Sequence, residues 1–78
     1  MTQQPSVKIE PSLLQQSVYD LEEYKRRLGR NFGQTKDHHM RVWYFNRYNN
    51  LENTIQQLCD TYNLQRRYKP HKLKLECI

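Results

Sequence analysis

Basic residues of this 78-residue chain gather in two short stretches. The first cluster follows an acidic stretch and holds Lys25, Arg26, Arg27 and Arg30. The second cluster lies after residue 63 and holds Arg66, Arg67, Lys69, Lys72 and Lys74. Tyr68 and His71 are interleaved with it. Guanidinium and ammonium groups neutralise phosphates, and aromatic rings accept unstacked bases, so these residue types suit contact with a nucleic acid.

Each cluster also has an explanation that requires no ligand. Cations near the C-terminus of a helix complement its dipole, which accounts for the first cluster equally well. A basic tail can also dock on an acidic protein surface. Because five Lys or Arg residues fall between residues 66 and 74, we favour an anionic partner for the tail. We expect the tail cations to grip the phosphates of DNA or RNA, helped by Arg26, Arg27 and Arg30.

A second candidate surface is aromatic. The N-terminal half of the predicted second helix is apolar or aromatic around most of its circumference, through Met40, Trp43, Tyr44 and Phe45. A helix of this kind needs cover on more than one side. We therefore expect this surface to contact a second copy of the chain or another protein. The alternative is that the terminal segments fold back and cover Trp43.

Part of this aromatic stretch, Arg41 to Arg47, resembles the recognition helix of homeodomains, whose pattern is Trp-Phe-any-Asn-any-Arg. The resemblance implies that Trp43 is a core anchor and that Asn46 reads adenine in the major groove. However, Tyr48 stands where the pattern ends on Arg, and Pro11 falls where the first helix of the family has core residues. The family is therefore not assigned.

Catalytic and metal chemistry find little support in the sequence. His38 and His39 are adjacent, so on a helix they point about 100 degrees apart and do not suit one metal ion. Cys59 and Cys77 have no metal-ligand spacing, and we interpret both as reduced thiols that could pair only as one disulfide. We expect no enzyme activity, no metal and no cofactor.

Size and composition restrict the function further. Thirteen Lys and Arg against eight Asp and Glu give a net charge of +5, and 36% of the residues are hydrophobic. A chain of this size buries one modest core, which excludes enzymes with separate cofactor and substrate domains. No apolar run reaches the roughly 18 residues of a membrane span, and no secretory signal is recognisable. We expect a cytoplasmic protein, or a nuclear one in a eukaryote.

The first predicted helix carries the first basic cluster. Ser12 with Gln15 three residues later has the spacing of a capping box, which marks a helix start. Apolar residues then recur at helical intervals, at Leu14, Val18, Leu21 and Leu28. Lys25 occupies the position between Leu21 and Leu28 where this pattern would place another apolar residue. Gly29 is a typical left-handed terminator. The pattern predicts a helix over about residues 13–28 and a connecting loop over residues 30–34.

The second predicted helix runs from Thr35, a candidate cap, to Tyr62 without Gly or Pro. Its apolar residues keep the alternating spacing of four and three that forms the seam of a coiled coil, at Tyr44, Tyr48, Leu51, Ile55, Leu58 and Tyr62. We favour one continuous helix. Asn49 with Glu52 three residues later also resembles a cap, so a break near residues 48–50 is the alternative.

The two ends of the chain are predicted to be extended. Residues 1–11 are expected to be disordered or to form a short strand, because Val7 and Ile9 alternate with polar residues. Residues 64–78 form the basic tail, and the alternation from Lys72 to Ile78 predicts a strand. The expected fold is mainly α: a single domain over residues 12–78, built as an antiparallel two-helix hairpin and completed by self-association or by a partner. The expected function is a small, dimeric, nucleic-acid-binding regulator, and the alternative is an interaction subunit or adaptor.

Overall fold

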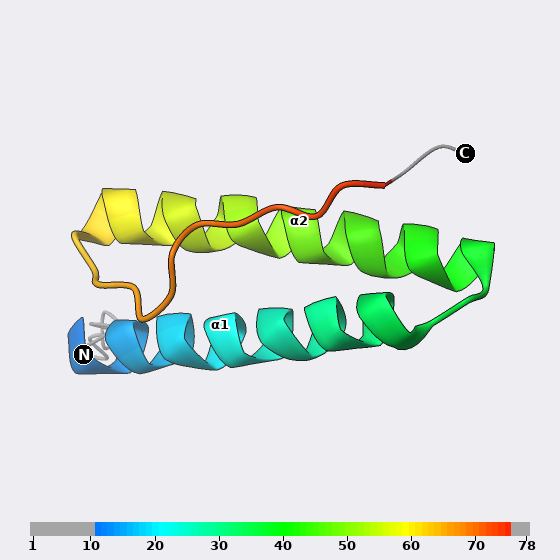
Figure 1. The fold of residues 1–78 in the computed structure, drawn as a ribbon. Coiled ribbons are helices and arrows are strands. Elements are labelled where there is room, and N and C mark those ends of the chain that lie inside the picture. Colours follow the sequence, from blue (N-terminus) through cyan, green and yellow to red (C-terminus); the bar gives the residue numbers. More distant parts are fainter. Residues whose placement is uncertain (1–10, 76–78) are drawn as a thin grey trace, which may run out of the picture.

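The computed structural model describes residues 11–75, which form two helices joined by a short loop (Figure 1). Helix α1 spans Pro11–Gln34 and helix α2 spans His38–Tyr62. The helices lie side by side in opposite directions. The prediction of a mainly helical chain with two packed helices is therefore confirmed. Neither of these two helices is long and apolar enough to cross a membrane.

Helix α1 continues past Gly29, where the sequence predicted its end, and the predicted loop over residues 30–34 is helical. Gly29 does not adopt a left-handed conformation. A Cβ atom at this position would lie 2.9 Å from Cε2 of Tyr48 on α2. Glycine at position 29 therefore permits a close approach of the two helices, and the extra turns place Phe32 in a buried position.

The loop between the helices is formed by residues 35–37, and Asp37 rather than Thr35 caps α2. The Asp37 carboxylate accepts a hydrogen bond of 3.0 Å from the backbone N–H of His39. Arg41 closes the loop, since its Nη1 donates to the carbonyls of Phe32 and Thr35 at 2.8 and 3.1 Å. Helix α2 then continues through residues 48–50 without a break and ends at Tyr62. Asn63 caps this end in a left-handed conformation.

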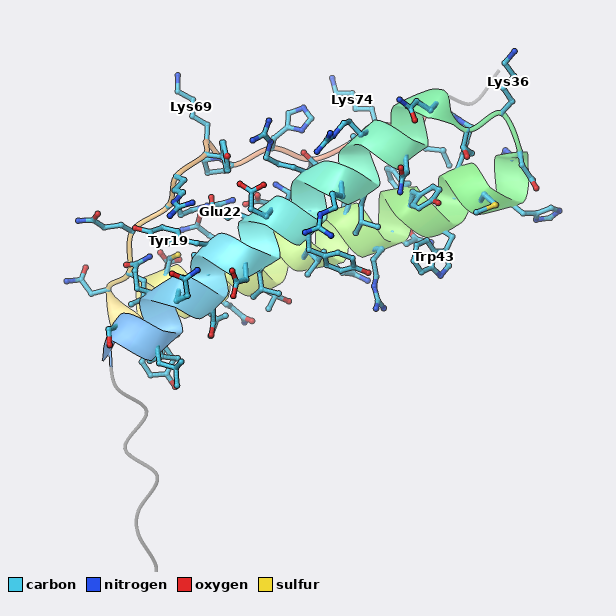
Figure 2. All side chains as sticks on the ribbon, turned by 90° about the horizontal axis from the view of Figure 1, so that it is seen from below. Tyr19, Glu22, Lys36, Trp43, Lys69 and Lys74 are labelled. Carbon is cyan, nitrogen blue, oxygen red and sulfur yellow. The ribbon has the colours of Figure 1, made fainter. Side chains whose placement is uncertain are left out.

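The core between the helices contains charged as well as apolar side chains. One apolar cluster consists of Val18, Ile55 and Cys59, with Leu21, Leu58 and Leu64 packed against it. Towards the loop, the buried apolar or aromatic side chains are Leu28, Phe32 and Tyr48. Buried charged residues are Glu22, Lys25 and Glu52. Glu22 and Glu52 accept hydrogen bonds from the backbone of the tail, and Lys25 is paired with Glu52, so the charged residues lie where the tail meets both helices. Figure 2 labels Glu22.

The tail leaves the end of α2, crosses to α1 and then returns along α2 (Figure 1). The predicted strand is not seen in its described part, residues 72–75. The reason is that the tail backbone is bonded to side chains of the helices instead of to a neighbouring strand. The prediction for the N-terminal segment lies outside the described residues, apart from Pro11, which is the first residue of α1.

Candidate functional site

Glu52 is the centre of a buried charge network that joins both helices to the tail. Its carboxylate is only 6% exposed and accepts hydrogen bonds from Lys25 and from both terminal nitrogens of Arg66. The backbone N–H of His71 adds a bond of 3.3 Å. Burial by itself raises the pKa of Glu52, but the hydrogen bonds from Arg66 and Lys25 outweigh it and lower the pKa to about 2. Glu52 is therefore a carboxylate at neutral pH.

Glu22 holds the tail against α1. Its two carboxylate oxygens accept hydrogen bonds of 3.0 Å from the backbone N–H groups of Arg67 and Tyr68. The Nε atom of Arg66 lies 3.7 Å from the same carboxylate and is buried without a hydrogen-bond partner among the described residues. Arg66, which was predicted to contact phosphate, is thus engaged with two carboxylates inside the fold. Its bond to Glu52 raises the pKa of its guanidinium.

Two side-chain amides hold the tail backbone at Gln65 and at Leu73. Gln15 donates to the carbonyl of Gln65 at 2.7 Å and accepts from its N–H at 2.9 Å. Asn49 makes the same pair of bonds with the backbone of Leu73, at 3.2 and 2.8 Å. Asn49 therefore serves the tail rather than capping a second helix. Because the tail backbone is bonded to the helices at several points between Gln65 and Leu73, the basic side chains of this stretch project from a defined path.

The fold brings the two basic clusters together at Arg26. Its guanidinium carbon lies 4.4 Å from the centre of the Tyr68 ring, and its Nη1 donates to the Tyr68 hydroxyl at 2.6 Å. Arg67 stacks in the same way on Tyr19 of α1, at 3.9 Å. Both arginines remain exposed, as do Lys72 and Lys74. Figure 2 shows Lys69 and Lys74 projecting from the tail away from the helices.

The basic residues line two separate hollows. Arg26 and Lys69 share a hollow of about 160 Å³ between α1, α2 and the tail, together with Tyr48, Tyr68 and His71. A second hollow, of about 300 Å³, lies on α1 alone and is lined by Arg27, Arg30, Asn31 and Gln34. Of the predicted site residues on α1, Arg26 therefore lies in the hollow that the tail helps to form, whereas Arg27 and Arg30 lie in the hollow on α1 alone.

The predicted aromatic surface lies near the loop. Met40 is 45% exposed and Trp43 is 50% exposed. With His39 and Tyr44 they line an apolar hollow of about 500 Å³. Trp43 packs edge-on against Tyr44, with ring centres 5.2 Å apart, while Phe45 is partly buried and lies outside the lining. The described tail leaves Trp43 half exposed, and this exposure does not fit the core anchor implied by the homeodomain resemblance.

Sequence reasoning missed the residues that hold the tail. The sequence places Glu22 in the acidic stretch, Glu52 only in the alternative cap with Asn49, and Lys25 at a gap in the apolar pattern, so it predicts no contact between these residues and the tail. A signal was present, because Lys25 occupies a seam position of α1 and Glu52 lies beside the seam of α2. Opposite charges in facing seams predict a buried ion pair, since an unpaired charge there is strongly unfavourable.

Cys59 belongs to the core. It is buried beside Val18 and Ile55, and this burial raises the pKa of its thiol. A thiol in such surroundings is a poor nucleophile, because the reactive form is the thiolate. Cys77 lies outside the described residues.

Comparison of the chain with models of known protein families, with curated proteins and with solved structures gives no match.

Proposed function

We propose that the protein binds nucleic acid through a basic surface formed by α1 and the tail, and that it acts as a small regulator. The contacting residues are Arg26, Arg27, Arg30, Arg67, Lys69, Lys72 and Lys74. None of them takes part in the ion pairs recorded among residues 11–75. This is the observation that carries the proposal. Arg26 is linked to the carboxylate of Glu23 only through the Tyr68 hydroxyl. The positive charges of these residues can therefore attract phosphates.

The buried network supports the proposal indirectly. It pairs Lys25 and Arg66 with Glu52 and Glu22, which are two of the acidic residues nearest to the tail. These carboxylates therefore do not offset the exposed cations. The same network fixes the tail beside α1. The cations of α1 and those of the tail, which are distant in the sequence, therefore contact the same nucleic acid. Arg66 contributes by positioning the tail, not by contacting phosphate.

Contacts of this kind follow the phosphate backbone and carry no sequence information by themselves. The proposal is therefore binding to single-stranded or double-stranded nucleic acid with little dependence on base sequence. Binding should depend steeply on salt, because each neutralised phosphate releases counterions.

The test is fluorescence anisotropy of labelled oligonucleotides at about 50 and about 200 mM salt. The variant Lys72→Ser/Lys74→Ser removes two tail cations, and its matched control, Lys36→Ser/Arg47→Ser, removes two exposed cations elsewhere. Both variants lose the same net charge. We expect the tail variant to bind more weakly than the control, with a salt slope on single strands smaller by about 1.4. Absence of binding by the unchanged protein at low salt would overturn the proposal.

A second candidate function is supported by the apolar hollow around Trp43. Figure 2 shows Trp43 projecting on the side of the hairpin opposite to Lys69 and Lys74. A protein partner, or a second copy of the chain forming a dimer, could therefore occupy the aromatic surface of Met40, Trp43 and Tyr44. Sedimentation velocity over a range of protein concentrations tests the dimer. Association that is abolished by Trp43→Ser and insensitive to salt is the expected result for this function.

A further inference from the structure

The hollow shared by Arg26 and Lys69 differs from the rest of the basic surface because three elements build it. Arg26 comes from α1, Tyr48 from α2, and Tyr68, Lys69 and His71 from the tail. Its volume of about 160 Å³ exceeds what a single water molecule needs. The hollow exists only while the tail is in place, so its geometry depends on the buried network described above.

The hollow has an excess of positive charge. Lys25, Arg66 and the carboxylate-bearing Glu22 also line the hollow. Lys25 is paired with Glu52, and Arg66 is paired with Glu52 and Glu22. The other two cations, Arg26 and Lys69, have no carboxylate partner among residues 11–75. An anion in this hollow would meet Arg26, which the Tyr68 hydroxyl links to Glu23, and Lys69, which has no ion-pair partner among residues 11–75.

His71 adds an imidazole ring to the lining of the hollow. Its Nδ1 lies 2.8 Å from the Tyr48 hydroxyl, and the two rings meet edge-on with centres 5.8 Å apart. When the Tyr48 hydroxyl donates to Nδ1, the neutral imidazole carries its proton on Nε2 and can donate to a ligand. The bond from the His71 backbone N–H to Glu52 fixes the residue at the edge of the hollow. Tyr48 is accordingly a positioning residue for His71.

We infer that this hollow receives one phosphate group of a bound nucleic-acid strand, with Arg26, Lys69 and His71 as its contacts. The Lys69 side chain projects outward from the tail in this structure (Figure 2), so it turns towards the hollow when the phosphate binds. The inference rests on the proposed function and adds a defined contact to it. The other exposed cations attract the strand by charge alone, and their exact positions matter little. At the hollow, by contrast, the geometry of the donors and the position of the tail both matter.

The experiment compares two pairs of single substitutions. Lys69→Gln is paired with Lys36→Gln, which removes the same charge from an exposed lysine at the loop (Figure 2). His71→Asn is paired with His38→Asn, which alters an exposed histidine at the start of α2. The probe is a fluorescein-labelled oligothymidylate of about 12 nucleotides, and the readout is its dissociation constant at low salt. Thermal denaturation of each variant checks that the fold is retained.

We expect Lys69→Gln and His71→Asn to weaken binding about tenfold, whereas the two control variants change it less than about threefold. The comparison of His71→Asn with His38→Asn is the sharper criterion, because both substitutions replace an exposed histidine and only His71 lines the hollow. If all four variants bind the probe alike, the phosphate contact in the hollow is refuted while the proposed function stands. If the unchanged protein does not bind the probe, both are refuted.

Discussion

The carboxylate of Glu52 on α2 accepts two parallel hydrogen bonds from the guanidinium of Arg66 in the tail, at 2.8 and 2.7 Å. This bidentate pair lies inside the structure, since both side chains are nearly buried. Lys25 of α1 binds the same carboxylate. One acidic group therefore connects α1, α2 and the tail, and it places the tail cations beside α1.

Glu52→Gln should destabilise the protein strongly. The substitution keeps the size of the side chain but leaves Lys25 and Arg66 buried with only Glu22 to compensate them. Breaking a buried ion pair by removing one partner costs about 3–5 kcal/mol. Urea denaturation followed by circular dichroism measures the free energy of unfolding. Asp60→Asn, which neutralises an exposed carboxylate of the same helix, is the control and should change it by less than about 0.5 kcal/mol. Equal effects of both substitutions would contradict the role assigned to Glu52.

Acid should weaken the fold through the same residue. The pKa of Glu52 is about 2 in the folded protein, against an ordinary value of 4.5. A lowered pKa means that its contribution is fully present above about pH 4.5 and is lost as the pH falls towards 2. The shift corresponds to about 3 kcal/mol. Denaturation at a series of pH values should show this loss, and Glu52→Gln should lack that part of it. An identical acid dependence in both proteins would refute the prediction.

The two glycines of α1 should respond differently to alanine. At Gly29 the new Cβ would lie 2.9 Å from Cε2 of Tyr48, whose ring is buried and hydrogen-bonded to His71. We expect Gly29→Ala to lower the free energy of unfolding by about 1–3 kcal/mol, because packing strain exceeds the gain in helix propensity. At Gly33 a Cβ meets nothing within 4 Å. Gly33→Ala should therefore stabilise α1 by up to about 1 kcal/mol. Chemical denaturation of both variants tests this difference, and stabilisation by both would disprove the close helix contact.

The sequence predicted the helices because their signal is local. The spacing of Val18 and Leu21, like that of Ile55 and Leu58, is a property of one helix face and requires no knowledge of the partner. Gly29 was misinterpreted because its reason, the ring of Tyr48, lies on the other helix. Sequence patterns describe neighbours along the chain well and neighbours across the fold poorly.

The candidate site was predictable only in part for the same reason. Arg66 and Arg67 are adjacent and chemically identical, yet one is paired with buried carboxylates while the other is exposed on Tyr19. Composition identified both as basic, but only the path of the tail distinguishes them. That path is set by hydrogen bonds from helix side chains, such as Gln15 and Asn49, to the backbone of the tail. Such contacts produce no periodic pattern in the sequence.

Asn49→Ala should release the tail at Leu73 without unfolding the hairpin of α1 and α2. The substitution removes both hydrogen bonds to Leu73, while alanine is a better helix former than asparagine and supports α2. We expect the amide of Leu73 to exchange with solvent much faster than in the unchanged protein, since it loses its acceptor. The amide of Ile55, in the core, should exchange at nearly the unchanged rate. Asn53→Ala, at an exposed position of α2, is the control and should leave Leu73 protected. If Leu73 stays protected in Asn49→Ala, other contacts hold this part of the tail. If Ile55 also loses protection, the tail and the hairpin fold as one unit.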